Sequence, residues 1–430
     1  MMQRIRQMMK GIVGEMSTLI TGNAIAQAIA LIAYFILTRI YTPEDISLYN
    51  IFYSYIDVLI ILSTCRLELA VVVADNDREA ASVARLAFRI NAALSILLVV
   101  AILTMCLSGL MPGTLARLGW IAMLIPPMVF FCGTSRVYSF LFNRAHRYGQ
   151  ISLSSMINSG SGAVAKILFG LLGMHNVGMP LGTVIGQAAA NINYRFSLRK
   201  TPLLSADGGD GDKNQYKALL NKYRRYPQYV TTKEFISSFS ANLPFLWLAA
   251  WFDRAEVGLF ALALTFTFQP TNLVSSAFER VLFARSSERM HRRESMWPMF
   301  RRFFLTLCAV VLPISVVAWV IAEPVFTFCF GGRWTGCGVY VQALLPWIML
   351  RFLAMSFAFV PNIFSTQRYE LYISLALLLL RVVVIAVGIS LGDFLTAIRL
   401  FAAVSALASV VQLVWYLWQL RRYEAHVIGR

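Results

Sequence analysis

Long apolar runs recur along the whole chain of 430 residues and are separated by short polar segments. Most of these runs have the roughly 18 to 25 residues that a helix needs to cross a hydrocarbon core of about 30 Å. Twelve ranges are predicted to be membrane-spanning helices: 17–38, 46–64, 86–111, 118–142, 151–173, 177–195, 234–250, 257–279, 303–322, 339–361, 370–390 and 394–418. The pattern predicts an all-α polytopic membrane protein with about twelve transmembrane helices.

The composition agrees with a membrane location. Hydrophobic residues make up 58% of the chain and charged residues 14%, with a mean hydropathy of +0.65, whereas soluble domains carry about 25% charged residues. The first apolar run contains Asn23 and Gln27 and lacks a signal-peptide cleavage pattern, so we expect a retained helix. The cysteines and histidines show no ligand spacing, which predicts no metal site, redox chemistry or cofactor.

The basic residues are distributed very unevenly between alternate loops. With the N-terminus placed in the cytoplasm, 28 Lys and Arg residues fall on that side and 4 on the other. By the positive-inside rule, this asymmetry predicts a multi-pass protein of the cell inner membrane with both termini cytoplasmic. The net charge of +17 is then explained by topology, and no nucleic acid partner is expected.

One polar stretch, 198–229, resembles a linker, with a flexible Asp- and Gly-rich centre at 205–212. It divides the chain into an N-terminal six-helix bundle at 1–200, a cytoplasmic linker at 201–230 and a C-terminal six-helix bundle at 231–430. Each bundle is predicted to contain an even number of spans, so both bundles would have the same orientation in the membrane.

The two halves also show signs of an internal repeat. Residues 43–49 match 254–260 at a spacing of 211, and the same spacing relates Glu68 to Glu279. Parallel repeats of this kind are related by an axis along the membrane normal and enclose a central cavity between two bundles. The alternative is chance similarity between apolar segments.

Polar side chains form stripes on the first two predicted helices of each half. The cavity candidates among them are Asn23, Gln27, Asp57 and Gln269, and shorter polar faces include Ser238 and Asn242. Polar groups in a membrane protein face its interior or water, so we expect these four residues to line the central cavity. For serine and threonine, hydrogen bonding between helices is the expected role.

Basic residues that fall inside predicted spans include Arg136, Lys166, Arg351, Arg381 and Arg399. Each would cost about 2.5 to 3.5 kcal/mol if it faced lipid at the bilayer centre. Arg136 and Arg399 lie near span ends, where long side chains reach the headgroups. Lys166, Arg351 and Arg381 are deeper and lack acidic neighbours in sequence. Because arginine binds phosphate through a bidentate fork, these three predict a cavity that holds a pyrophosphate.

Three acidic residues are candidates for coupling to a proton or sodium ion: Asp57, Glu68 and Glu279. The alternative is that these carboxylates form ion pairs at the cytoplasmic ends of the helices, with Arg66 and Arg280 as partners.

Several short motifs occur in a characteristic order: Thr21-Gly22-Asn23, Thr38-Arg39-Ile40-Tyr41-Thr42-Pro43-Glu44, Arg66-Leu67-Glu68-Leu69-Ala70, Arg225-Tyr226-Pro227-Gln228-Tyr229, Asn242-Leu243-Pro244, Phe330-Gly331-Gly332-Arg333-Trp334 and Leu344-Leu345-Pro346. With this set, the sequence resembles the O-antigen and polysaccharide flippases of the multidrug/oligosaccharidyl-lipid/polysaccharide exporter superfamily. It departs from the family pattern at Ser47, usually Gly, and at Cys337, usually Ala.

The resemblance implies transfer of an undecaprenyl-pyrophosphate-linked oligosaccharide from the cytoplasmic to the periplasmic leaflet, alongside polymerase or ligase machinery. One alternative is a multidrug or small-solute transporter of the same superfamily. The other is a membrane polysaccharide polymerase, an enzyme. Such enzymes resemble one another in having a large periplasmic loop, whereas the longest loops predicted here are cytoplasmic, so no enzymatic activity is expected.

Overall fold

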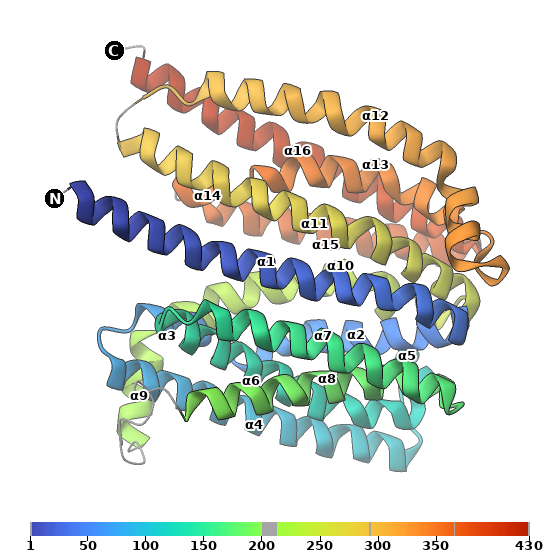
Figure 1. The fold of residues 1–430 in the computed structure, drawn as a ribbon. Helices are drawn as coiled ribbons and strands as arrows, with labels where there is room; N and C mark the ends of the chain where they lie inside the picture. The colour runs from blue at the N-terminus through green and yellow to red at the C-terminus, as the bar shows by residue number, and fades with distance from the viewer. Residues whose placement is uncertain (1, 200–212, 292–293, 365, 429–430) are drawn as a thin grey trace. The chain divides into compact units, whose positions relative to one another are not determined.

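The computed structural model describes residues 2–199, 213–291, 294–364 and 366–428. Within these residues the regular secondary structure consists of helices, with no strand, and the chain forms two compact units, Met1–Leu246 and Trp247–Arg430 (Figure 1). The helices of the first unit are α1 (Met2–Ile40), α2 (Pro43–Ser63), α3 (Glu68–Val73), α4 (Asp77–Ser108), α5 (Gly113–Leu118), α6 (Ile125–Arg144), α7 (Tyr148–Leu171), α8 (His175–Leu198), α9 (Lys213–Lys222) and α10 (Thr232–Leu246). Those of the second unit are α11 (Arg254–His291), α12 (Trp297–Phe330), α13 (Cys337–Ser356), α14 (Val360–Ile363), α15 (Gln367–Leu391) and α16 (Phe394–Ile428).

The lengths and compositions of these helices make the chain a multi-pass membrane protein. Nine helical segments of the described chain are long and apolar enough to cross a membrane. Every predicted span overlaps a helix, but those overlapping α7, α8 and α10 are not among the nine. The helices α7 and α8 are rich in Gly, Ser and Asn, and α10 has only 15 residues.

Close helix packing in the first unit depends on glycine. The helices α7 and α8 lie side by side (Figure 1), and a Cβ atom added at Gly186 would lie 2.6 Å from the backbone oxygen of Asn158. At Gly182 an added Cβ would lie 2.8 Å from the backbone nitrogen of Lys166. Small residues thus let the two backbones approach, as is common in membrane helix pairs.

The second half of the predicted linker is a folded part of the first unit. The predicted centre at 205–212 lies outside the described residues. After it, Tyr216 and Leu219 of α9 and the following Tyr223 pack into a core formed with α3, α4 and α6. The ammonium of Lys222 also donates to Asp75 at 2.8 Å. These contacts hold α9 against the ends of α3 and α4.

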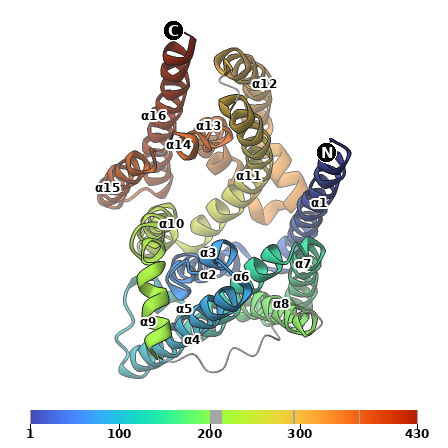
Figure 2. The same ribbon diagram turned by 90° about the vertical axis from the view of Figure 1, so that its left-hand side faces the viewer.

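In the second unit, α13 is the central helix. It packs against α11, α12 and α16, and α16 also packs against α15 (Figure 2). The core of this unit is rich in aromatic residues, and Phe300 of α12 meets Phe357 edge to face at a centroid distance of 6.0 Å. At its end α15 stops at Gly392, whose φ of 71° is easily adopted only by glycine.

The boundary between the compact units lies later than the predicted division. The sequence analysis assigned 234–250 to the C-terminal bundle, whereas α10 belongs to the first unit. The reason is a polar contact between α10 and α2, described below. The predicted arrangement of two six-helix repeats stays a prediction.

The structure bears on the repeat in two ways. The helices α2 and α11 begin at Pro43 and Arg254, which reproduces the spacing of 211. The local structures around Glu68 and Glu279 differ, because Glu68 starts the short helix α3 after the turn that ends α2, while Glu279 lies within α11. The two glutamates therefore differ in local backbone structure.

Candidate functional site

The first polar feature joins α2 to α10. The carboxylate of Asp57 accepts hydrogen bonds from the Ser238 hydroxyl at 2.8 Å and from the Asn242 amide at 2.9 Å. Periodicity had placed these residues on polar faces of their helices, and the structure brings those faces together. Here Asp57 bonds two helices to each other, the role that the sequence analysis had expected for serine and threonine.

The first unit also has an open polar cavity of about 360 Å³ among α1, α2, α6, α7 and α8. Its walls include amide, hydroxyl, phenol and guanidinium groups, from Asn23, Ser135, Arg136, Asn158, Gln187 and Tyr194. Of the predicted cavity residues, Asn23 lies in this wall. Gln27 lies one helical turn further along α1 and is half-buried.

Arg136 is the cationic group of this cavity, and sequence reasoning missed it. We had expected its side chain to reach the headgroups from near a span end. Instead it lines the cavity, and its buried Nη1 atom has no hydrogen-bond partner in the described part of the chain. A signal was present in the sequence, because Ser135 and Ser139 make this part of α6 polar.

Lys166 of α7 lies elsewhere in the first unit, next to α2. Its ammonium donates to the Tyr49 hydroxyl at 3.2 Å and lies 4.7 Å from the centre of the same ring. The tyrosine offers both a lone pair and a π-face to the cation, so Lys166 is stabilised without an acidic partner.

The two deep arginines of the second unit share one aromatic cluster. Arg351 of α13 lies 4.1 Å from the Phe268 ring centre and donates to Asn272 at 2.7 Å. Arg381 of α15 lies 4.6 Å from the centre of the Phe401 ring. Aromatic rings and neutral oxygens therefore contact both cations, and their role in holding a pyrophosphate stays a prediction.

Arg381 is packed more tightly than expected. Its Nε and Nη2 atoms donate to the Ser405 hydroxyl at 3.0 and 2.8 Å, and its side chain is only 5% exposed. It packs against protein, and removing it would leave a hole. Gln269, the predicted cavity residue of α11, is half-buried one turn before the Asn272 that binds Arg351.

The acidic candidates have different surroundings. Glu68 is fully buried and accepts from Arg66 at 3.3 Å, and Arg66 also pairs with Glu234 of α10. This ion pair is the alternative that the sequence analysis set against ion coupling. Glu279 is half-buried on α11, next to Arg280. A role for these residues or for Asp57 in coupling stays a prediction.

The cavity of the first unit has the chemistry of a polar ligand site. Amides and hydroxyls donate to and accept from hydroxyl groups, tyrosine rings provide flat apolar walls, and a guanidinium binds phosphate or carboxylate oxygens. A buried, unsatisfied guanidinium nitrogen is costly in an apolar medium, so a ligand oxygen or water at Arg136 would stabilise the site.

The fold is that of known membrane transporters. A multidrug resistance transporter of the MATE family in the MOP superfamily aligns with a TM-score of 0.72 and 14% identity, over 96% of this chain and 99% of that one. The lipid II flippase MurJ aligns with a TM-score of 0.69 and 10% identity, over 97% and 91%. A MOP-superfamily transporter from Pyrococcus furiosus aligns with a TM-score of 0.65 and 14% identity, over 95% and 96%.

The family follows from the sequence itself. The family model described as polysaccharide biosynthesis protein matches residues 36–339, and the chain belongs to this family. The family predicted from the ordered motifs is thereby confirmed. No curated protein matches the sequence at a significant level.

Proposed function

We propose that the protein translocates an undecaprenyl-pyrophosphate-linked oligosaccharide from the cytoplasmic to the periplasmic leaflet during the biosynthesis of a surface polysaccharide. It acts as a carrier and catalyses no covalent step. It resides in the inner membrane with both termini in the cytoplasm, and polymerase or ligase machinery receives its product.

The single observation that carries this proposal is the cavity around Arg136. A polysaccharide-biosynthesis family member with a transporter fold needs a place for sugar hydroxyls and for an anionic group. The cavity offers six side chains of the required kinds in one wall, from Asn23, Ser135, Arg136, Asn158, Gln187 and Tyr194. Such a concave site with a few polar groups is the usual form of a small-molecule site.

Deleting the gene in its host tests the proposal in cells. We expect loss of the surface polysaccharide and accumulation of its lipid-linked repeat unit with the glycan still facing the cytoplasm, both reversed by the wild-type gene. If the protein were a polymerase, its deletion would instead leave single repeat units exposed on the periplasmic side. That outcome would contradict the proposal of a flippase.

The second candidate is a multidrug or small-solute transporter of the same superfamily, which the TM-score of 0.72 to a multidrug transporter favours. In that case deletion would raise sensitivity to toxic solutes and leave the surface polysaccharide intact. Measuring both phenotypes in one deletion strain separates the two candidates.

A further inference from the structure

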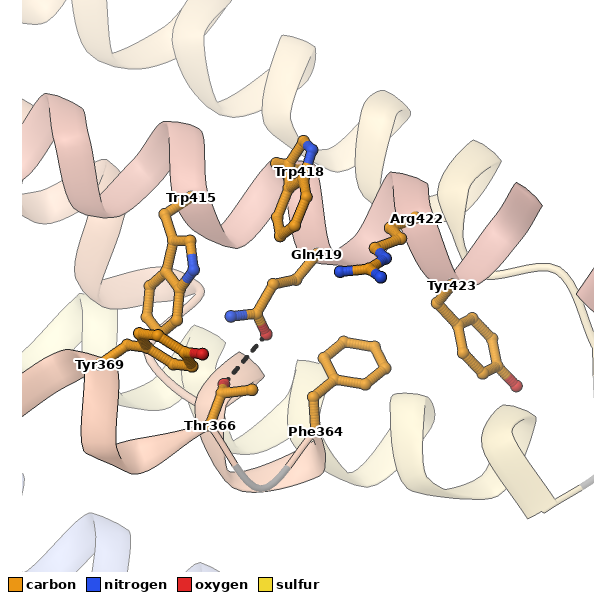
Figure 3. Close-up of a pocket in the computed structure, with 8 residues that line it drawn as sticks. All are labelled: Phe364, Thr366, Tyr369, Trp415, Trp418, Gln419, Arg422 and Tyr423. Carbon is orange, nitrogen blue, oxygen red and sulfur yellow. Dashed lines mark hydrogen bonds between the residues drawn. The ribbon is translucent and has the colours of Figure 1, made fainter. Parts of the chain in front are cut away.

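A groove of the second unit lies outside the segment 36–339 that matches the family. It has a volume of about 520 Å³ and is lined by Phe364, Thr366 and Tyr369 on one side and by residues of the last part of α16 on the other (Figure 3). Its walls are mainly aromatic, and Gln419 and Arg422 of α16 bring an amide and a guanidinium into it.

The polar groups of the groove are held in place. Gln419 is 8% exposed, and its amide oxygen accepts from the Thr366 hydroxyl at 3.1 Å, while the amide nitrogen points away from Thr366 (Figure 3). The guanidinium of Arg422 lies 5.3 Å from the centre of the Trp418 ring. The groove therefore presents an ordered donor and a cation within aromatic walls.

An apolar stripe on α16 leads to this groove. The exposed side chains of Leu407, Val411 and Val414 are followed on the same helical face by Trp418 and Arg422, at spacings of three and four residues. At the rim, Tyr369 is 59% exposed. Trp and Tyr at such positions mark the headgroup level of a bilayer. A ligand that fits both the apolar stripe and the polar groove has a long apolar tail and a polar head group, as a lipid does.

The charge of the groove selects the headgroup. One guanidinium and one neutral amide complement a single negative phosphodiester with an uncharged polyol. Among the described residues that line the groove, Arg422 is the cation, and a pyrophosphate carries more negative charge than it matches. The ammonium of a zwitterionic headgroup would meet Arg422 with the same sign. The guanidinium already occupies the region near the Trp418 ring, where an ammonium would otherwise bind.

We propose that this groove binds the headgroup of an anionic phospholipid of the surrounding bilayer, with the phosphodiester on Arg422, the polyol near Gln419 and one acyl chain along the stripe from Val414 to Leu407. The bound lipid bridges α15 and α16.

Quenching of tryptophan fluorescence by phospholipids with brominated acyl chains tests this site. The full-length protein is placed in nanodiscs, and brominated phosphatidylglycerol is titrated against brominated phosphatidylcholine. The signal of Trp415 and Trp418 is obtained by subtracting the spectrum of the double variant Trp415→Phe/Trp418→Phe. We expect wild-type protein to prefer phosphatidylglycerol by about fivefold, the effect of one cation near a membrane surface.

A matched pair of variants identifies the responsible cation. Arg422→Gln is expected to abolish the preference, while Arg421→Gln, which changes the exposed neighbour outside the groove, is expected to retain it. Both substitutions lie on an exposed helix surface, and circular dichroism verifies that helix content is unchanged. Equal loss in both variants, or no lipid preference in wild-type protein, would overturn the proposal.

Two competitors distinguish the source of the phosphate. Soluble glycerol phosphate at the same concentration is expected to leave the quenching unchanged, because it lacks the acyl chain. Displacement by glycerol phosphate would show a soluble-anion site. Displacement by an equimolar polyprenyl pyrophosphate would assign the groove to a pyrophosphate lipid, and either result overturns the phospholipid proposal.

Discussion

Asn242 of α10 donates a hydrogen bond of 2.9 Å to the carboxylate of Asp57 on α2, across 185 residues of sequence. The same carboxylate accepts from Ser238 one turn earlier on α10. These bonds fix the register of α10 against α2 and make α10 part of the first compact unit.

Replacing Asp57 is therefore expected to weaken the first unit. Asp57→Ala leaves Ser238 and Asn242 without this acceptor and should lower the free energy of unfolding by about 1 to 3 kcal/mol. Asp57→Asn keeps an acceptor oxygen and should cost less, about 0.5 to 1.5 kcal/mol. Thermal unfolding in detergent measures both. An Ala variant as stable as wild type would contradict the role given to this contact.

The glycine contact between α7 and α8 gives a second prediction. In Gly186→Ala the new methyl group would lie 2.9 Å from the backbone of Gly162 as well as against Asn158, and separating the helices should cost about 1 to 3 kcal/mol. Gly160→Ala on α7 meets nothing within 4 Å and should gain up to about 1 kcal/mol from helix propensity. Equal melting temperatures of the two variants would refute the close-packing argument.

The docking of α9 should depend on pH. The hydrogen bond from Lys222 lowers the pKa of the Asp75 carboxyl, and the bonds to Asp75 and Glu79 raise the pKa of Lys222. The carboxylate therefore contributes above its unfolded pKa of about 3.9 and ceases to contribute as pH falls through its lower folded value. The ammonium contributes below about 10.4 and ceases to contribute as pH rises through its higher folded value.

Docking is thus expected to be constant between about pH 4 and 10 and to weaken outside that window. The anisotropy of a fluorophore at Asn221→Cys, in a variant without the native cysteines, reports the mobility of α9. Lys222→Met should raise mobility within the window and flatten the profile. Lys217→Met, on an exposed position of the same helix, should leave the profile as in wild type, and an equal effect of the two would rule out the ion pair.

The sequence could predict the helices and the family, because long apolar runs and ordered motifs are local features. It could not predict what contacts Arg351 and Arg381, since the rings of Phe268 and Phe401 come from other helices. Periodicity defines the polar face of a helix but not which helix packs against that face. The hydrogen bond between Asp57 and Asn242 could therefore not be predicted either.

Two other misjudgements have the same origin. Arg136 was judged by its distance from a predicted span end, whereas its surroundings are set by the helices that enclose the cavity. The segment after 205–212 was judged by the composition of that centre, yet Tyr216 of α9 and the following Tyr223 pack in a core with residues of α4. Tertiary contacts decided both positions.

Lys166, Arg351 and Arg381 remain the predicted pyrophosphate ligands. Their expected contributions to the stability of the fold differ. Arg381→Ala should lower the melting temperature, because it leaves the Ser405 hydroxyl and the Phe401 ring without their contact. Arg351→Lys and Arg381→Lys should restore polysaccharide export only in part, since the charge returns without the bidentate fork. Export is measured at matched protein levels, with exposed Arg399→Lys as the control. Full export by the Lys variants would contradict bidentate binding of the pyrophosphate by these arginines.

Translocation in a purified system tests the central claim most directly. Proteoliposomes carrying a fluorescent polyprenyl-pyrophosphate oligosaccharide in both leaflets are exposed to an external glycosidase. Wild-type protein should make the inner-leaflet pool accessible, and Arg136→Gln should slow that phase by about tenfold, the loss of one charge-assisted hydrogen bond. Folded wild-type protein that leaves half of the oligosaccharide protected, as in protein-free vesicles, would contradict the proposed function.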